Sequence, residues 1–304
     1  MDPLTQAIET VSSELPHIKR RPGEHMKNHT SFKIGGPVKV MYFPENPEDM
    51  VSLCSLLRDH GAAPLILGNG TNLLVNDDAM DIAVINTTGM HSIERTGQTG
   101  ITACAGVSLA KLAVFACECG LSGLEFAHGI PGTLGGAVIM NAGAYGGEIG
   151  DAVSITKALS QKGDVITVKG GEHDFSYRHS RFSDFGDVVL SSVISMQDGD
   201  KQSIRARMDE LSVIRRENQP LDIPSAGSAF KRPKDGYAAQ LIEQAGLKGY
   251  SVGGAQVSQK HAGFIVNRGG AIFPDVLAVI EHVREVVFNK FGIELEPEVK
   301  IISV

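Results

Sequence analysis

Two glycine-rich stretches are the residues of this chain whose types and spacing point most directly to chemistry. The run Gly129–Gly147 reads GIPGTLGGAVIMNAGAYGG and has no acidic or basic side chain. Glycine loses more conformational entropy on folding than any other residue, so a dense cluster indicates backbone at positive φ or in close approach to a ligand. Leu134, Val138 and Met140 favour burial, unlike the polar residues of a linker. We therefore predict a buried glycine-rich segment.

The second stretch, GNGTNLL, begins at Gly68 directly after the predicted strand PLIL. Leu73 stands where the dinucleotide fingerprint G-x-G-x-x-G needs its third glycine, and the Gly-Lys pair of a P-loop does not occur. Main-chain N–H groups of such a turn can converge on one anion, although an ordinary tight turn has the same composition. Together, the two stretches predict a pyrophosphate site that needs no charged side chains.

A serine and a lysine offer a different chemistry. Ser228 and Lys231 have the S-x-x-K spacing of a serine acyl-transfer nucleophile. The same spacing recurs at Ser154 and Lys157 in a predicted strand, and the companion motifs S-D-N and K-T-G are absent from the sequence. The S-x-x-K spacing alone is therefore weak evidence for an acyl-transfer enzyme.

Arginines cluster at two places in a chain that is acidic overall. Arg178 and Arg181 lie in the aromatic run FSYRHSRF. Arginine can bind a carboxylate through two parallel hydrogen bonds, and a surface ion pair is the alternative reading. Arg215 and Arg216 end a predicted helix, where the helix dipole alone would favour them.

The histidines do not predict a metal site. His25 and His29 are four residues apart in a loop with no H-E-x-x-H pattern, which indicates surface histidines. His128 and His261 adjoin glycine-rich or strand segments, where a hydrogen-bonded structural imidazole is expected. Glu298, between Pro297 and a terminal strand, has no functional signal of its own.

Charge, cysteine spacing and hydropathy indicate which partners and which compartment to expect. The 28 basic and 35 acidic residues give a net charge of -7, which argues against a nucleic-acid partner. The only close cysteine spacing is C-x-C, so we expect buried free thiols at Cys54, Cys104, Cys117 and Cys119. The N-terminus lacks an apolar signal region, and no run is long enough to span a membrane, so we expect a cytoplasmic protein.

The pattern of elements indicates an α+β protein. Helical spacing or capping signals mark helices over 4–15, 47–60, 109–119, 200–217, 237–245 and 274–291. Short apolar runs mark strands at VKVMYF, PLIL, IAVIN, ITACAG, VSITKALS, VITV, VVLSSVISM, GFIVN and EVKIIS. The texture changes to hairpin-linked strands from Asp151 onward, and the helix near Asp200 is interpreted as the hinge into a third unit.

Seven fragments in order give a resemblance that covers nearly the entire chain. GNGTNLL, GIPGTLGGAVIMNAGAYGGE, YRHSRF, RRENQP, GSAFKRP, HAGFIVN and EPEV resemble the UDP-N-acetylenolpyruvoylglucosamine reductases, the MurB family. The compact C-terminal part resembles the shorter subtype, which lacks an additional tyrosine-bearing loop. The resemblance implies an FAD-binding domain in two lobes (1–80 and 81–200) of the vanillyl-alcohol-oxidase (PCMH) type, and a C-terminal α+β substrate-binding domain (201–304).

The same resemblance implies a reaction. Non-covalently bound FAD takes hydride from NADPH and delivers it to the enolpyruvyl group of UDP-N-acetylglucosamine enolpyruvate, yielding UDP-N-acetylmuramate for peptidoglycan synthesis. Carried over by motif, Ser228 is the proton donor, and Arg178 and Glu298 stabilise the enolate. Because a carboxylate would repel that enolate, we hypothesise that Glu298 is protonated and donates a hydrogen bond. A monomer that contacts neither nucleic acid nor membrane is expected.

The resemblance also implies two sets of binding residues. The cofactor set comprises Gly68, Asn69, Gly70, Thr71, Asn72, Leu73, Gly129, Ile130, Pro131, Gly132, Thr133, Gly135, Gly136, Ala137, Asn141, Ala142 and Gly143. The substrate set comprises Tyr177, Arg215, Gln219, Lys231, His261 and Asn267. The alternatives are another FAD-dependent oxidase or dehydrogenase of the same fold, a Ser-Lys acyl-transfer enzyme, and a non-catalytic nucleotide-binding protein.

Overall fold

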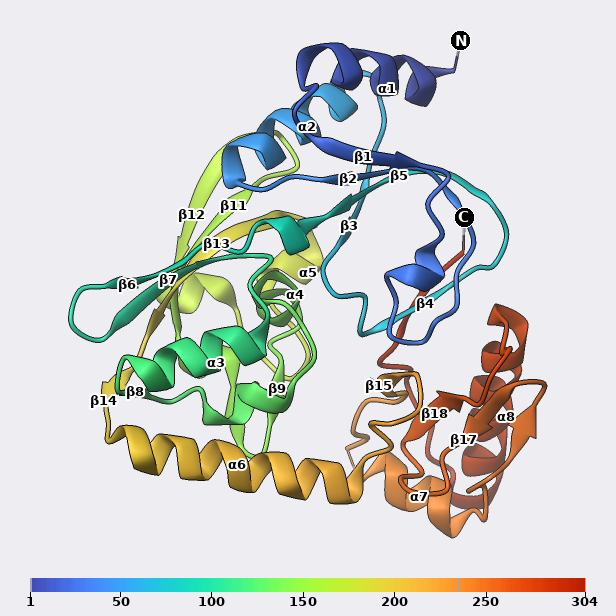
Figure 1. The fold of residues 1–304 in the computed structure, drawn as a ribbon. Coiled ribbons are helices and arrows are strands. Elements are labelled where there is room, and N and C mark those ends of the chain that lie inside the picture. The colour runs from blue at the N-terminus through green and yellow to red at the C-terminus, as the bar shows by residue number, and fades with distance from the viewer. Residues whose placement is uncertain (1, 235, 304) are drawn as a thin grey trace. The chain divides into compact units, whose positions relative to one another are not determined.

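The computed structural model describes residues 2–234 and 236–303 and divides them into two compact units (Figure 1). The first unit comprises residues 1–22, 40–69 and 82–214, and the second comprises 23–39, 70–81 and 215–304. Each unit is therefore assembled from separated stretches of chain, and the boundary near residue 214 falls inside helix α6.

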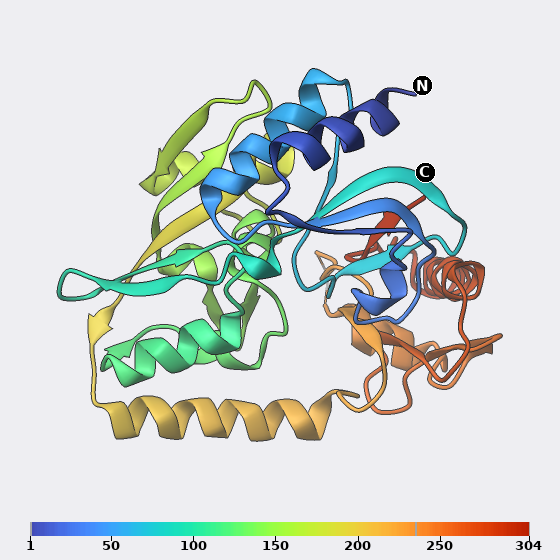
Figure 2. The same cartoon turned by 45° about the horizontal axis from the view of Figure 1, so that its top comes forward.

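The first unit contains six α-helices, counted over the described residues and including most of α6. They are α1 (Pro3–Glu14), α2 (Pro47–Asp59), α3 (Leu109–Glu118), α4 (Leu134–Ile139), α5 (Arg181–Phe185) and α6 (Lys201–Asn218). Asn46 caps α2 by accepting a hydrogen bond from Asp49 N at 2.8 Å, and Ser108 caps α3 through Lys111 N at 3.2 Å. A short polar side chain at this position satisfies an otherwise unpaired helix N–H. Helices α1 and α2 lie side by side (Figures 1 and 2).

Two larger sheets form the framework beneath these helices. The four-stranded sheet has the order β1-β2-β5-β3, with β1 (Lys19–Pro22), β2 (Val38–Phe43), β5 (Met80–Asn86) and β3 (Leu65–Leu67). The five-stranded sheet has the order β12-β11-β13-β7-β6, with β12 (Val165–Lys169), β11 (Val153–Leu159), β13 (Val188–Ser195), β7 (Gly100–Cys104) and β6 (Ile93–Thr96). All pairs in the five-stranded sheet are antiparallel, and the pairs β6–β7 and β11–β12 are hairpins of consecutive strands.

Short elements complete the first unit. Two small ladders pair β9 (Gly143–Ala144) with β10 (Gly147–Glu148), and β8 (Leu121–Ser122) with β14 (Gln197–Asp198). Among the described residues, the 3-10 helices of the first unit are η2 (Thr87–Gly89), η3 (Glu125–Gly129), η4 (Ile149–Asp151) and η5 (Gly170–His173), and η1 (Met26–Asn28) belongs to the second unit.

The second unit packs helices on a second antiparallel sheet. The sheet order is β15-β18-β17-β16, with β15 (Ser225–Ser228), β18 (Phe264–Asn267), β17 (Ala255–Val257) and β16 (Ser251–Val252). Helix α8 (Phe273–Phe291) contacts β17, and α7 (Ala238–Gln244) contacts α8. The terminal strand β19 (Lys300–Ile302) pairs in parallel with β4 (Leu73–Val75), the strand that directly follows the GNGTN turn.

Three clusters of buried apolar side chains form the cores. One cluster joins α3, α4 and the five-stranded sheet, and another joins α1, α2 and the four-stranded sheet. The third gathers α7, α8 and β15–β18 of the second unit around Phe32, Ile34 and Leu74. The α+β class that the sequence predicted is confirmed.

Two local expectations need revision. Cys54 and Cys117 are buried free thiols, but Cys104 and Cys119 are only half-buried, since they stand at the end of β7 and at the C-cap of α3. The glycine-rich segment is buried at Thr133–Gly135 and Ala137–Val138, while Pro131 and Gly136 are exposed. In the part of the chain that the structure describes, none of the helices combines the length and apolarity that a bilayer crossing requires.

Candidate active site

The two glycine-rich stretches contact each other within the first unit. Asn69 donates a hydrogen bond from Nδ2 to the Pro131 carbonyl at 3.1 Å. A Cβ added at Gly68 would lie 2.3 Å from Thr133 Oγ1, so only glycine allows this approach. The sequence predicted a single anion site from two distant segments, and the structure brings these segments into contact.

Gly70 continues this turn in the second unit, at a position that has no room for a side chain. Its φ is +59°, and an added Cβ would lie 2.1 Å from the His29 carbonyl oxygen. The Gly70 carbonyl in turn accepts a hydrogen bond from Ser31 N at 3.0 Å. The turn is therefore held tightly against the 28–31 segment.

The other predicted cofactor residues lie along the same two stretches. Thr71 and Asn72 precede β4 and Leu73 begins it, whereas Gly129 ends η3, Ile130 and Gly132 follow in the loop, and Gly135, Gly136 and Ala137 lie in α4. The N–H of Gly135 donates to the Ala105 carbonyl at 2.8 Å, so packing already uses that amide. Asn141, Ala142 and Gly143 follow α4, and Gly143 begins β9.

Arg178 lies in a tight turn beside the glycine-rich segment. Ser176 and His179 form an isolated antiparallel bridge, which leaves Tyr177 and Arg178 at the tip. Arg178 has φ +56° and donates from Nη2 to the Gly143 carbonyl at 3.4 Å. Its guanidinium lies 5.0 Å from the Tyr177 ring centroid, within cation–π range. The predicted enolate-stabilising arginine is therefore next to the predicted cofactor segment.

Ser228 and Glu298 come together in the second unit. Glu298 N donates to the Ala229 carbonyl at 2.8 Å, so the chain carrying Glu298 runs directly beside β15, which ends at Ser228. The Ser228 side chain is exposed and Glu298 is half-buried. Asn72 Nδ2 donates to the Glu298 carbonyl at 3.1 Å, which links the glycine turn to the acid.

Three of the predicted substrate residues in the second unit already interact with other residues of the protein. Lys231 pairs with Glu296 at 2.5 Å, and His261 Nδ1 accepts from Gly263 N at 3.1 Å while burial lowers the pKa of His261. Asn267 is buried and bonds the Phe32 carbonyl and the N–H groups of Gly269 and Ala271, which is a structural arrangement.

Gln219, one helical turn beyond Arg215, differs from these residues. Its side-chain Oε1 is buried and has no hydrogen-bond partner among the residues that the structure describes. Buried polar atoms are nearly always paired, so an orphaned acceptor fits contact with a donor on a bound ligand.

One cluster has the composition of a metal site. Single ligand atoms of Asp174, His179 and Asp184 lie within 4.8 Å of one another. The cluster is largely exposed, and His179 Nε2 already contacts both Asp184 carboxylate oxygens at 3.0 Å. The hydrogen bond to Asp184 raises the pKa of His179, as an ion pair would, and we assign no metal to it.

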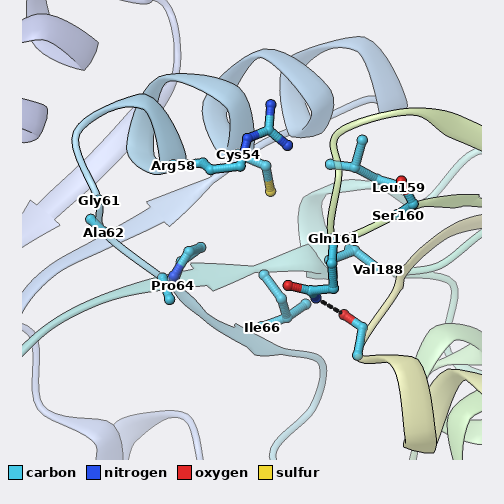
Figure 3. Close-up of a pocket in the computed structure, with 12 residues that line it drawn as sticks. Cys54, Arg58, Gly61, Ala62, Pro64, Ile66, Leu159, Ser160, Gln161 and Val188 are labelled. Carbon is cyan, nitrogen blue, oxygen red and sulfur yellow. Dashed lines mark hydrogen bonds between the residues drawn. The ribbon is translucent and has the colours of Figure 1, made fainter.

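A cavity of about 320 Å³ in the first unit is lined by none of the predicted catalytic, cofactor-binding or substrate-binding residues (Figure 3). Arg58 and Cys54 of α2 line one side, and Gln161 lines the other. Burial raises the pKa of the Cys54 thiol to about 11, so it is uncharged at neutral pH. This cavity offers no reactive group for the predicted chemistry.

The arrangement of the glycine stretches fits a dinucleotide diphosphate. Gly68 leaves room for the Thr133 side chain against its main chain, and Gly136 leaves an exposed, side-chain-free position in α4. Uncharged main-chain groups can bind a diphosphate in such a cradle.

The fold belongs to the class of flavoprotein folds of the vanillyl-alcohol-oxidase type. Residues 38–169 match the model of an FAD binding domain. An alkyldihydroxyacetonephosphate synthase structure shares this fold at a TM-score of 0.50 and 13% identity, covering 64% of this chain and 40% of that one. Residues 219–302 match the C-terminal domain of UDP-N-acetylenolpyruvoylglucosamine reductase.

The chain belongs to the UDP-N-acetylenolpyruvoylglucosamine reductase family. It is 48% identical to the reductase of Caldanaerobacter subterraneus subsp. tengcongensis over 97% of this chain and 98% of that one. It is 46% identical to the Agathobacter rectalis reductase over 97% and 98%. The crystal structure of the reductase (MurB) from Thermus caldophilus superposes with a TM-score of 0.80 at 34% identity, covering 94% of this chain and 99% of that chain.

Proposed function

We propose that this protein reduces UDP-N-acetylglucosamine enolpyruvate to UDP-N-acetylmuramate with NADPH, in the synthesis of peptidoglycan precursors. Bound FAD would supply the hydride-transfer chemistry between NADPH and the methylene carbon of the enolpyruvyl group. The observation that carries the proposal is the contact between the two glycine stretches, in a chain nearly half identical to a named reductase along its whole length.

The three proposed catalytic residues stabilise or neutralise the negative charge that develops during this reduction. Hydride addition to an unsaturated carboxylate builds negative charge on the carboxylate, and the Arg178 guanidinium stabilises it in the transition state. Glu298, when protonated, donates a hydrogen bond to the same developing charge. The exposed Ser228 hydroxyl gives its proton to the carbon that bears the carboxylate.

The binding residues are proposed on the same grounds. The cofactor set of the two glycine stretches, apart from Asn141, holds the diphosphate. The substrate is bound by Tyr177, Arg215, Gln219, Lys231, His261 and Asn267. The orphaned Gln219 acceptor supports the second assignment most directly. We also propose a cytoplasmic monomer whose functional segments are 1–80, 81–200 and 201–304.

An assay of purified protein tests the proposed function. The preparation should be yellow, release FAD on denaturation, and oxidise NADPH in a reaction that requires the enolpyruvyl substrate. Oxidation that proceeds with oxygen alone would favour another flavin oxidase of the same fold. A colourless protein that hydrolyses acyl substrates would contradict the proposal and favour Ser228 and Lys231 as acyl-transfer residues.

A further inference from the structure

Asn141 uses its side chain within the protein and has no amide donor left for a cofactor. The residue is 1% exposed and has φ +43°, an unusual conformation for a residue with a side chain. Its Nδ2 donates to Glu148 Oε2 at 2.7 Å and to the Ser176 carbonyl at 3.0 Å, while Oδ1 accepts from Gly150 N at 2.9 Å. An asparagine amide has two N–H donors, and both are engaged.

The Ser176 carbonyl is one end of the turn that carries Arg178. Ser176 and His179 exchange backbone hydrogen bonds of 3.1 Å in both directions. Between them, Arg178 adopts φ +56°, and a non-glycine residue in this region persists only when its surroundings hold it there. The contact from Asn141 to Ser176 is such a restraint.

A second contact fixes the same turn from the other end of the segment. Arg178 Nη2 donates to the carbonyl of Gly143, two residues after Asn141. The 141–143 segment therefore holds both the main chain of the turn, through Ser176, and the guanidinium of Arg178.

We propose that Asn141 is a positioning residue for Arg178, with Glu148 as the group that orients the Asn141 amide. The inference rests on the role proposed for Arg178 in the reduction. It replaces the expectation that Asn141 binds the cofactor, and it assigns Glu148 a function that the sequence did not indicate. Misplacing a charge-stabilising group by about 1 Å can slow a reaction by as much as ~10²-fold.

The substitution Asn141→Asp tests this role because it removes both donors and places a second carboxylate against Glu148. FAD content and flavin reduction by NADPH should stay within about twofold of wild type, while enolpyruvyl reduction should slow by about tenfold to a hundredfold. Adding Glu148→Gln removes this repulsion and places an amide donor at position 148. The hydrogen bond between the two side chains can then run from position 148 to position 141. The double variant should therefore recover at least about threefold of the lost rate.

Two controls separate this inference from the proposed function. Asn289→Asp makes the same chemical change at an exposed position of α8 and should leave both half-reactions unchanged. Arg178→Gln should itself slow enolpyruvyl reduction; full activity there would refute the role of Arg178. A slow Arg178→Gln with a fully active Asn141→Asp would overturn only the Asn141 inference. Loss of FAD, or equal slowing of both half-reactions without rescue, would also overturn it.

Discussion

Glu298 is the residue whose protonation state decides between two accounts of its role. As a proton-bearing acid it donates a hydrogen bond to the developing enolate, and as a carboxylate it would oppose the same charge. A glutamine at this position keeps an N–H donor and cannot ionise. The substitution therefore separates the donor function from the charge.

We expect Glu298→Gln to keep most of the activity and Glu298→Ala to lose about 10²–10³-fold in kcat, the typical cost of one lost donor. A loss of kcat in Glu298→Gln as large as that in Glu298→Ala would exclude the donor role.

Gly70 shows why the turn beginning at Gly68 needs a glycine at this position. Both its positive φ and the space beside the His29 carbonyl exclude a side chain. We expect Gly70→Ala to lower the free energy of unfolding by about 1–3 kcal/mol and to reduce FAD content.

A matched control for this change is Gly23→Ala. Gly23 has nearly the same φ, +62°, but no atom lies within 4 Å of an added Cβ. Its cost should be limited to the backbone conformation. Thermal unfolding and bound-FAD absorbance measure both variants, and equal losses would show that the approach to His29 is unimportant.

At the scale of elements, local signals predicted helices and strands well, and distant pairings poorly. The caps at Asn46 and Ser108 and the alternation in VSITKALS are local, so α2, α3 and β11 were recognised. The parallel pairing of Leu73 with Lys300 depends on residues at opposite ends of the chain, and no local pattern specifies that register.

Helix α4 was missed for a related reason. Its sequence LGGAVI has two glycines, which disfavour a helix intrinsically. The helix is stabilised instead by packing, since the N–H groups of Leu134 and Gly135 donate to the carbonyls of Val107 and Ala105. Likewise, the proposed site residues were inferred from motifs, whereas the contact of Asn141 with Ser176 required the structure.

The 3-10 helix η5, which follows the β11–β12 hairpin, ends at a buried histidine that makes stability depend on pH. His173 is fully buried, contacts the Gly170 carbonyl and Thr156 Oγ1, and stacks on the Phe175 ring. Burial lowers the pKa of His173 below its usual value, so the folded state binds this proton less readily than the unfolded state. Its contribution to stability is full above about pH 6.5 and is lost as pH falls below that value.

Chemical unfolding between pH 5 and 8 measures this effect. The free energy of unfolding should fall with decreasing pH in the wild type, and the slope should be smaller in His173→Gln. An unchanged slope would show that His173 does not supply the dependence.

At the scale of the whole molecule, the two compact units contribute different proposed catalytic groups. Arg178 belongs to the first unit, and Ser228 and Glu298 belong to the second. The family resemblance predicted all three from motifs scattered along the chain, because sequence order is preserved even where a fold interleaves its segments. Binding of FAD to the folded state alone should raise stability by about 2.7 kcal/mol at a free concentration of 100 times Kd.

Rapid-mixing kinetics of Ser228→Ala test the central claim, that hydride arrives through the flavin and the proton comes from this serine. Reduction of the bound flavin by NADPH should proceed at the wild-type rate. Reoxidation by the enolpyruvyl substrate should slow by about 10²–10⁴-fold, the usual contribution of a general acid. A variant that reduces the enolpyruvyl substrate at the wild-type rate, or that loses both half-reactions equally, would contradict the account.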